Sequence, residues 1–245
     1  MRNNLLWILT GISLFLCTGC FDLHEDVHLN KDGSGTYAFF TDLGQFKDFF
    51  GAFGNESKQD KDKNKNDTDK NKLSADFQKL NDYLKDIDGI TDAHVIADTT
   101  LFKFGVAFNF KNVTALNKAL NTIYHEDNED TDAKDKKAEE VFFELRDNSF
   151  IRYETKSTGN LLKDKGVTES FGKDSKNNPF GGLDALLQTV SFSCTYDFDR
   201  EIKSVSNESS MISSNFKKVS TTCHPFAKET KDNTACTLTN IITFK

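Results

Sequence analysis

The chain has 245 residues, of which 37% are hydrophobic, so it can bury the core of one substantial domain or of two small ones. Its formal net charge is −7, from 31 basic and 38 acidic side chains. Nucleic acid and anionic lipid surfaces require an excess of clustered cations, so this charge balance argues against both as partners.

The first residues have the layout of a secretory signal peptide, with Arg2 ahead of an apolar run from Leu5 to Leu16. A permanent membrane span is the alternative, but a run of about 12 residues is shorter than the roughly 20 that a spanning helix needs. Thr18-Gly19-Cys20 resembles the lipobox of bacterial lipoproteins, although Cys17 stands where that motif has Leu. The resemblance implies cleavage before Cys20 and palmitate-type acyl chains on that cysteine, and two or three such chains hold a protein stably on a membrane.

The first part of the mature chain is predicted to form a β-hairpin and two helices. Apolar residues alternate from Phe21 to Leu29, turn residues fill Lys31 to Gly35, and a second strand follows from Thr36 to Phe40. Helical spacing follows Asp42 and again Ser74. The apolar positions of these two helices are Leu43, Phe46, Phe50 and Phe53, and then Phe77, Leu80, Leu84 and Ile87.

Two polar stretches are predicted to be disordered insertions, near 55–72 and near 126–138. Asn55 to Lys72 has no apolar residue, six Lys and five acidic residues, so burial cannot offset the entropy lost on ordering it. Glu126 to Glu140 has eight acidic residues against three Lys.

Between the insertions, Leu101 to Phe110 is the clearest strand, because its apolar residues alternate onto one face. Val113, Leu116, Leu120 and Ile123 then predict a helix. A second hairpin is expected from Val141 to Arg146 and Phe150 to Tyr153. The stretch over 157–179 is interpreted as a polar loop, and strands are expected over Val190 to Phe198 and Ala235 to Phe244.

The histidines do not predict a metal site. His24 and His28 share one strand face but stand roughly 13 Å apart along it, too far to share an ion, so a polar exposed face is the better interpretation. The turn around Gly33 places His28 and Phe39 where an EF-hand needs oxygen ligands, which excludes that calcium loop. His94 and His125 are isolated, and we expect no metal and no cofactor.

Three cysteines remain after Cys20, and cysteines of exported proteins tend to pair. Cys223 with Cys236 is the favoured disulfide because the two flank a short polar loop. Cys194 falls on an apolar strand face and is expected to be a buried, inert thiol. Adjacent residues of an extended chain point apart, so Cys223 and His224 are a poor nucleophile and base.

Catalytic sequence motifs are missing. The chain has no Gly-x-Ser-x-Gly elbow, no phosphate-cradling Gly-x-x-x-x-Gly-Lys loop and no His-Glu-x-x-His helix. Abundant acids leave acid/base catalysis open, but nothing singles out one pair of carboxylates. We therefore expect no enzyme and name no catalytic or ligand-binding residue.

Three stretches together resemble a group of uncharacterised lipoproteins from Bacteroidota-type bacteria: Cys20-Phe21, Leu29 to Gly35 with its Asp-Gly-Ser-Gly turn, and Phe198 to Asn207. More distantly the layout is similar to LppM-like lipoprotein domains, an α+β class. The resemblance implies fold class and anchoring and carries no catalytic motif. The residues after Cys20 lack the acidic run that marks surface display in such bacteria, which favours an outer-membrane lipoprotein facing the periplasm.

The sequence thus predicts an α+β fold in which a mostly antiparallel sheet packs against two or three amphipathic helices. We expect a signal peptide over 1–19, an α+β region over 20–156, the polar loop over 157–179, and a β-rich part of the same domain over 180–245. The favoured function is a non-catalytic binding or scaffolding module of the cell envelope, with an envelope protein as its partner. A carrier for an apolar or lipid ligand is the alternative, and a hydrolase without a recognisable motif is third.

Overall fold

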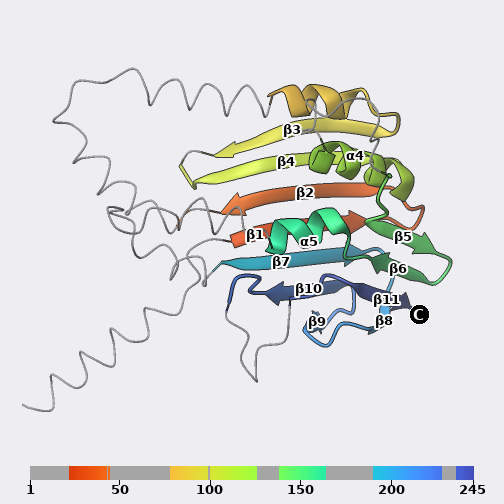
Figure 1. Cartoon of the computed structure of the whole chain (residues 1–245). Helices are drawn as coiled ribbons and strands as arrows, with labels where there is room; N and C mark the ends of the chain where they lie inside the picture. Colours follow the sequence, from red (N-terminus) through yellow and green to blue (C-terminus); the bar gives the residue numbers. More distant parts are fainter. Residues whose placement is uncertain are drawn as a thin grey trace, which may run out of the picture.

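The computed structural model describes residues 22–42, 44, 78–98, 100–125, 138–163, 190–227 and 236–245. They form the α+β fold that the sequence predicted, with a seven-stranded sheet, a four-stranded sheet and helices. Figure 1 shows the large sheet running across the molecule, with α4 and α5 in front of it. The leader over 1–19, Cys20, the helix expected from Leu43 to Phe53, the insertion near 55–72 and nearly all of that near 126–138 lie outside the described residues.

The seven-stranded sheet, sheet A, has the order β3-β4-β2-β1-β7-β10-β9. All neighbours are antiparallel except β1 and β7, which are parallel. A strand from the last third of the chain therefore lies beside the first one. The strands are β1 (Asp22–Leu29), β2 (Gly35–Asp42), β3 (Ile90–Asp98), β4 (Lys103–Phe110), β7 (Ser191–Phe198), β9 (Ser210–Ile212) and β10 (Lys218–Cys223).

The four-stranded sheet, sheet B, has the order β5-β6-β11-β8 and is antiparallel throughout. It joins a hairpin from the middle of the chain to two strands from its end. The strands are β5 (Phe143–Arg146), β6 (Ser149–Arg152), β8 (Ile202–Val205) and β11 (Asn240–Phe244). The sequence predicted one sheet and missed this second one, because alternation shows that a strand has a buried face but not which sheet it joins.

The predicted N-terminal hairpin is confirmed: β1 and β2 pair in register from Asp22 with Asp42 to Leu29 with Gly35. The turn between them closes through Asp32, whose Oδ1 accepts a hydrogen bond from the backbone N–H of Ser34 at 3.0 Å. Gly33 takes a φ of +85°, which residues with a Cβ rarely adopt. The Asp-Gly-Ser-Gly run is therefore turn chemistry.

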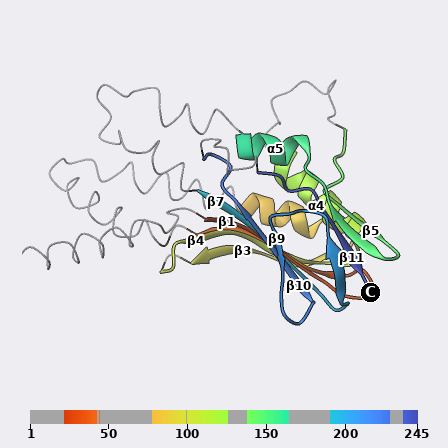
Figure 2. The ribbon, with the colours of Figure 1, turned by 90° about the horizontal axis from the view of Figure 1, so that it is seen from below.

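The predicted helix at Val113 is confirmed as α4 (Val113–His125). Asn112 caps it, with its Oδ1 accepting a hydrogen bond from the backbone N–H of Ala115 at 2.9 Å. Leu116 and Leu120 are fully buried. Residues 78–85 form another helix, which covers part of the one predicted around Leu80 and Leu84. Figure 2 shows these helices on the same side of sheet A.

The core between the sheets is built from aromatic rings. Phe150 of sheet B contacts Phe143 at 5.3 Å and Phe198 at 5.5 Å between ring centroids, and Phe198 contacts Phe244 at 5.0 Å. All four side chains are at most 2% exposed. The large number of Phe residues is thus used to join sheet A to sheet B, where rings in edge-to-face contact pack densely.

The polar loop expected over 157–179 is wrong at its beginning, because α5 (Lys156–Lys163) occupies that stretch. The helix begins with reciprocal hydrogen bonds: the Thr158 backbone N–H donates to Thr155 Oγ1 at 3.2 Å, and the Thr155 backbone N–H donates to Thr158 Oγ1 at 2.9 Å. This is a variant of the capping box with Thr in the place of Glu, which is why the residue pattern was missed.

The last strand is shorter than the predicted Ala235 to Phe244, because β11 begins at Asn240. Before it, the Asn207 side-chain amide donates hydrogen bonds to the carbonyl oxygens of Thr237 and Thr239, at 3.1 and 3.2 Å. These carbonyls therefore bond to a side chain instead of a neighbouring strand.

Candidate functional site

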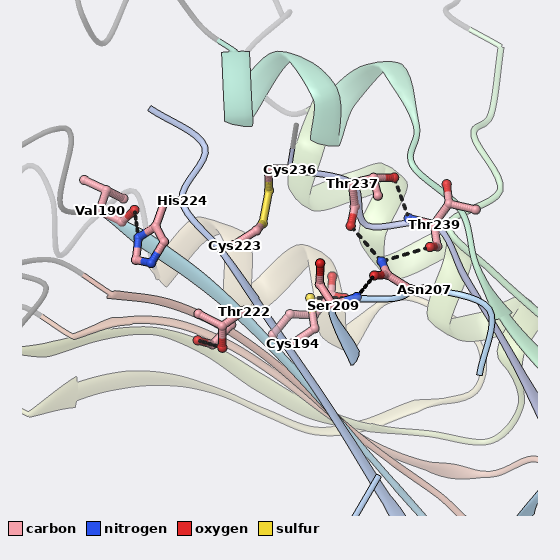
Figure 3. Close-up of a disulfide and its surroundings, with 12 residues drawn as sticks. Val190, Cys194, Asn207, Ser209, Thr222, Cys223, His224, Cys236, Thr237 and Thr239 are labelled. Carbon is pink, nitrogen blue, oxygen red and sulfur yellow. Dashed lines mark hydrogen bonds between the residues drawn. A yellow bond between two sulfur atoms is a disulfide. The ribbon is translucent and has the colours of Figure 1, made fainter. Parts of the chain in front are cut away.

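The structure joins Cys223 and Cys236, the pair that the sequence favoured, in a disulfide with 5.3 Å between their Cα atoms. Figure 3 shows that it connects the end of β10 to the segment that leads into β11, and so links sheet A to sheet B. Cys194 lies on β7 as a buried free thiol. Burial, and then the Glu25 carboxylate, raise the pKa of this thiol well above its usual value, so it stays neutral and unreactive.

His224, the residue after Cys223, does not activate a cysteine. The sulfur of Cys223 is bonded in the disulfide, and the Nδ1 atom of His224 lies 3.2 Å from the Val190 carbonyl oxygen (Figure 3). This side chain therefore fixes the end of β10 against the start of β7.

The remaining histidines have separate surroundings. His24 stacks on Phe40 with 4.7 Å between ring centroids, and the Nε2 atom of His28 lies 3.1 Å from Asn30 Oδ1 and 4.0 Å from an Asp199 carboxylate oxygen. His94 Nδ1 contacts the Asp92 carbonyl oxygen. Within the part of the chain that the structure describes, no three His, Cys, Asp or Glu side chains are grouped to hold a metal ion.

A buried ion pair spans the two sheets. Glu25 of β1 and Arg152 of β6 form two hydrogen bonds, of 2.9 Å from Nε and 2.8 Å from Nη2, and both side chains are fully buried. Tyr196 donates a third hydrogen bond to Glu25 at 2.8 Å, and Arg152 Nη1 donates to the Tyr153 carbonyl oxygen at 2.6 Å. The carboxylate and guanidinium are thus satisfied without water.

The electrostatics of this pair show that it is structural. Burial by itself would lower the pKa of Arg152, but the charge and hydrogen bonds of Glu25, together with Tyr196 and Tyr124, hold that pKa well above its usual value. Burial, followed by Cys194 and Glu25, raises the pKa of Tyr196. Because Glu25, Arg152 and Tyr196 are at most 1% exposed, no substrate reaches these groups.

The position of Glu25 in the sequence is a signal of the buried ion pair that the predictions from sequence did not include. Glu25 stands between Leu23 and Val27 in the alternation of β1, where it is in phase with the residues that point into the core. A charge in that phase requires a buried counter-charge. The sequence does not show which cation supplies this counter-charge, because Arg152 is 127 residues away from Glu25.

The described surface is hollowed where β1 ends. Two adjoining hollows, of about 340 and 720 Å³, share Lys31, Asp147 and Arg200 in their walls, and we call them together the Arg200 cleft. The smaller one has an apolar floor from Leu29, Phe198 and Phe244. In Figure 1 the turn between β5 and β6 and the end marked C lie at this end of the molecule.

Backbone hydrogen bonds between distant segments hold the walls of the cleft. The Phe244 N–H donates to the Asn148 carbonyl at 3.0 Å, and the Lys245 N–H donates to the Glu201 carbonyl at 2.9 Å. The Asp199 N–H donates to the Leu29 carbonyl at 3.2 Å. Both sheets and the first hairpin are joined here, so the cleft is a rigid part of the fold.

Arg200 lies between the two hollows in a fixed position. Its guanidinium carbon is 4.4 Å from the centroid of the Phe244 ring. Nη1 donates to the Asp147 carbonyl oxygen at 2.8 Å, and Nη2 donates to Asn148 Oδ1 at 2.9 Å. Stacking and hydrogen bonding together remove the rotamer freedom that an exposed Arg usually keeps.

Two ion pairs lie at the rim. Arg146 pairs with Glu144, and hydrogen bonds from Arg146 and then Tyr153 lower the pKa of that carboxyl to about 2. Lys245 pairs with Glu201 at 3.0 Å, and this hydrogen bond lowers the pKa of Glu201. Both carboxylates are therefore ionised at neutral pH and neutralise their partners.

No family model matches the chain, and no curated protein matches its sequence. Among solved structures, the chain is similar to the folded domain of the LppM protein of Mycobacterium tuberculosis, determined by NMR, with a TM-score of 0.37 and 10% sequence identity. The similarity covers 93% of this chain and 91% of that domain.

Proposed function

We propose that this protein is a lipid-anchored, non-catalytic binding or scaffolding module of the cell envelope, held on the outer membrane by acyl chains on Cys20 and facing the periplasm. It binds its partner at the Arg200 cleft, which points away from the membrane. Among the described residues, no helix is long and apolar enough to cross a membrane. In this proposal the anchor is the lipid on Cys20.

The observation that carries the proposal is the position of β1. Only Phe21 separates Cys20 from Asp22, the first residue of β1, so covalent geometry keeps the Cα atoms of Cys20 and Asp22 within about 8 Å. From Asp22 the strand then rises roughly 23 Å to Leu29. Leu29 and Lys31 line the cleft, so the cleft lies at the end of β1 and the proposed anchor is attached just before its start.

The anchor is tested by replacing Cys20→Ala, with Cys17→Ala as the matched control. We expect Cys20→Ala to abolish incorporation of radiolabelled palmitate and to release the protein from the membrane fraction, because no other acylated residue is proposed. The control variant should incorporate the label and stay in the membrane fraction. Unchanged labelling and fractionation of Cys20→Ala would contradict the anchor.

The binding face is tested in intact cells with a photo-crosslinking amino acid. The probe is placed at Lys31, in the cleft, and as a control at Asp82, an exposed residue of the helix over 78–85. The proposal expects a defined adduct from position 31 and none from position 82. Equal labelling at the two positions, or no adduct at either, would count against a binding face at the cleft.

Packing argues against the carrier alternative. An apolar carrier needs a cavity lined by apolar side chains. In the described core, Phe150 packs against Phe143 and Tyr196, and all three side chains are at most 1% exposed, so protein already covers their surfaces. Lipid found by mass spectrometry in extracts of the purified protein would revive the carrier, and turnover in a broad substrate panel would favour the hydrolase.

A further inference from the structure

Three cations face the larger hollow of the Arg200 cleft without a carboxylate partner. Within the described residues, Lys31, Arg200 and Lys217 line this hollow and none of them forms an ion pair. Among the neighbouring carboxylates, Glu201 pairs with Lys245 at 3.0 Å and is also influenced by the charge of Lys217, and an Asp199 oxygen lies 4.0 Å from His28 Nε2. These cations are therefore available to an anion from outside the protein.

The charge of that anion follows from the unpaired groups. The charged side chains that line the larger hollow are four cations, Lys31, Arg200, Lys217 and Lys245, and three carboxylates, Asp147, Asp199 and Glu201. The larger hollow therefore carries a formal excess of one positive charge, in a protein whose net charge is −7. Like charges gathered in one hollow repel, and a bound dianion removes that repulsion.

Arg200 supplies directional hydrogen-bond donors. A guanidinium carries five N–H groups, and the contacts to Asp147 and Asn148 use two of them. The remaining donors belong to a group already held against Phe244. An oxyanion therefore meets a preorganised donor set, with Lys31 and Lys217 as mobile charges around it.

We propose that the Arg200 cleft binds a phosphate monoester, an inference that builds on the proposed binding function. At neutral pH such a group carries a charge of about −1.5 to −2 and three acceptor oxygens, which can accept hydrogen bonds from Arg200 and pair with Lys31 and Lys217. The smaller hollow, with its floor of Leu29, Phe198 and Phe244, takes the first carbon atoms of the esterified alcohol. The phosphate belongs to a free phosphoester or to a phosphorylated lipid headgroup.

The test uses detergent-solubilised full-length protein and phosphorus NMR titrations with inorganic phosphate, glycerol 3-phosphate and short-chain phosphatidic acid. We expect glycerol 3-phosphate to bind more tightly than inorganic phosphate, because only the ester reaches the smaller hollow. Binding of both esters supports a free phosphoester as a ligand, and binding of phosphatidic acid alone supports a lipid headgroup. Absence of binding by all three phosphates overturns the proposal.

The double variant Lys31→Gln/Lys217→Gln should weaken binding at least tenfold. Its matched control is Lys79→Gln/Lys118→Gln, which removes the same charge from exposed helix positions away from the cleft and should leave binding unchanged. Neither Lys31 nor Lys217 forms an ion pair within the described residues, and circular dichroism checks that both doubles fold. Equal weakening in the two doubles would reveal general charge attraction and overturn the site.

Failure of the anchor and failure of the phosphate site can be told apart. Cys20→Ala changes a residue that precedes β1 and does not line the cleft, so this variant should bind glycerol 3-phosphate as the unmodified sequence does. Loss of membrane attachment in that variant with binding retained supports both proposals. Membrane attachment retained in Cys20→Ala would remove the anchor alone, whereas a cleft that binds no phosphate would remove the inference alone.

Discussion

Glu25 and Arg152 show how a charged residue on the core-facing side of a strand can organise a core. Each charge loses its hydration on burial, a cost of several kcal/mol per ion that the partner charge and the surrounding hydrogen bonds must offset. Here Tyr196 and the Tyr153 carbonyl complete the shell. The pair does not add much net stability, but it makes a misplaced sheet B costly, since any shift leaves a bare charge in the core.

We predict that breaking the pair is costly in either direction. Glu25→Gln and Arg152→Met should each lower the free energy of unfolding by about 3 to 5 kcal/mol, because each leaves its partner charged and buried. Urea unfolding measures the loss. The double variant should lose clearly less than the sum of the singles, and strict additivity would contradict direct coupling between the two side chains.

At the scale of the element, two asparagines of α4 hold the chain that enters sheet B. Asn117 Oδ1 accepts hydrogen bonds from the backbone N–H groups of Phe142 and Phe143, at 3.0 and 2.9 Å, and its Nδ2 donates to the Phe143 carbonyl at 2.8 Å. Asn121 exchanges two hydrogen bonds with the backbone of Glu140, both of 2.8 Å. Side chains of α4 thereby satisfy backbone groups before and at the start of β5, as a neighbouring strand would.

Replacing Asn117→Ala should lower the free energy of unfolding by about 2 to 4 kcal/mol. The reason is that backbone groups of Phe142 and Phe143 lose their partners inside the core, and each buried unsatisfied group costs about 1 to 3 kcal/mol. Hydrogen exchange should speed up at these two amides in particular. Lys118→Ala, an exposed position of the same helix, is the control and should change neither quantity; equal effects would indicate loss of helix stability instead.

At the scale of the whole molecule, the disulfide and the aromatic core close the two sheets against each other. Cys223 ends an inner strand of sheet A, and Cys236 precedes β11, which lies inside sheet B. The bond closes a loop with a sequence separation of 13. A crosslink of this length stabilises mainly by limiting the unfolded chain.

Reduction should therefore lower the free energy of unfolding by about 3 kcal/mol. Urea unfolding with and without reductant measures the difference. The effect should persist in Cys194→Ala, because Cys194 is a free thiol, and it should vanish in Cys223→Ser/Cys236→Ser. A reductant effect that survives in the double variant would place the stabilising bond elsewhere.

Local patterns determined most of the elements. The first hairpin, β4, α4 and the second hairpin follow from alternation, helical spacing and turn residues, all of which act between residues near in sequence. The helix α5 was missed because its capping residues, Thr155 and Thr158, are not the Glu-containing pattern that signals a helix start.

The cleft could not be predicted. Lys31, Asp147 and Arg200 come from three separate turns, and nothing in the sequence around Arg200 distinguishes it from other surface arginines. Its role depends on Phe244 and Asn148, which only the pairing of β11 with β6 brings to it.

By itself the sequence determined the α+β class, the strands and helices with strong periodicity and the turn at Gly33, and it favoured Cys223 with Cys236 as the disulfide. Only the tertiary structure decided that the strands divide into two sheets, that β7 lies parallel to β1, and that Glu25 meets Arg152. The physical reason is distance along the chain. Periodicity in the sequence indicates which face of each element is buried. The element that packs on that face is determined by packing and charge between residues that can be more than one hundred positions apart.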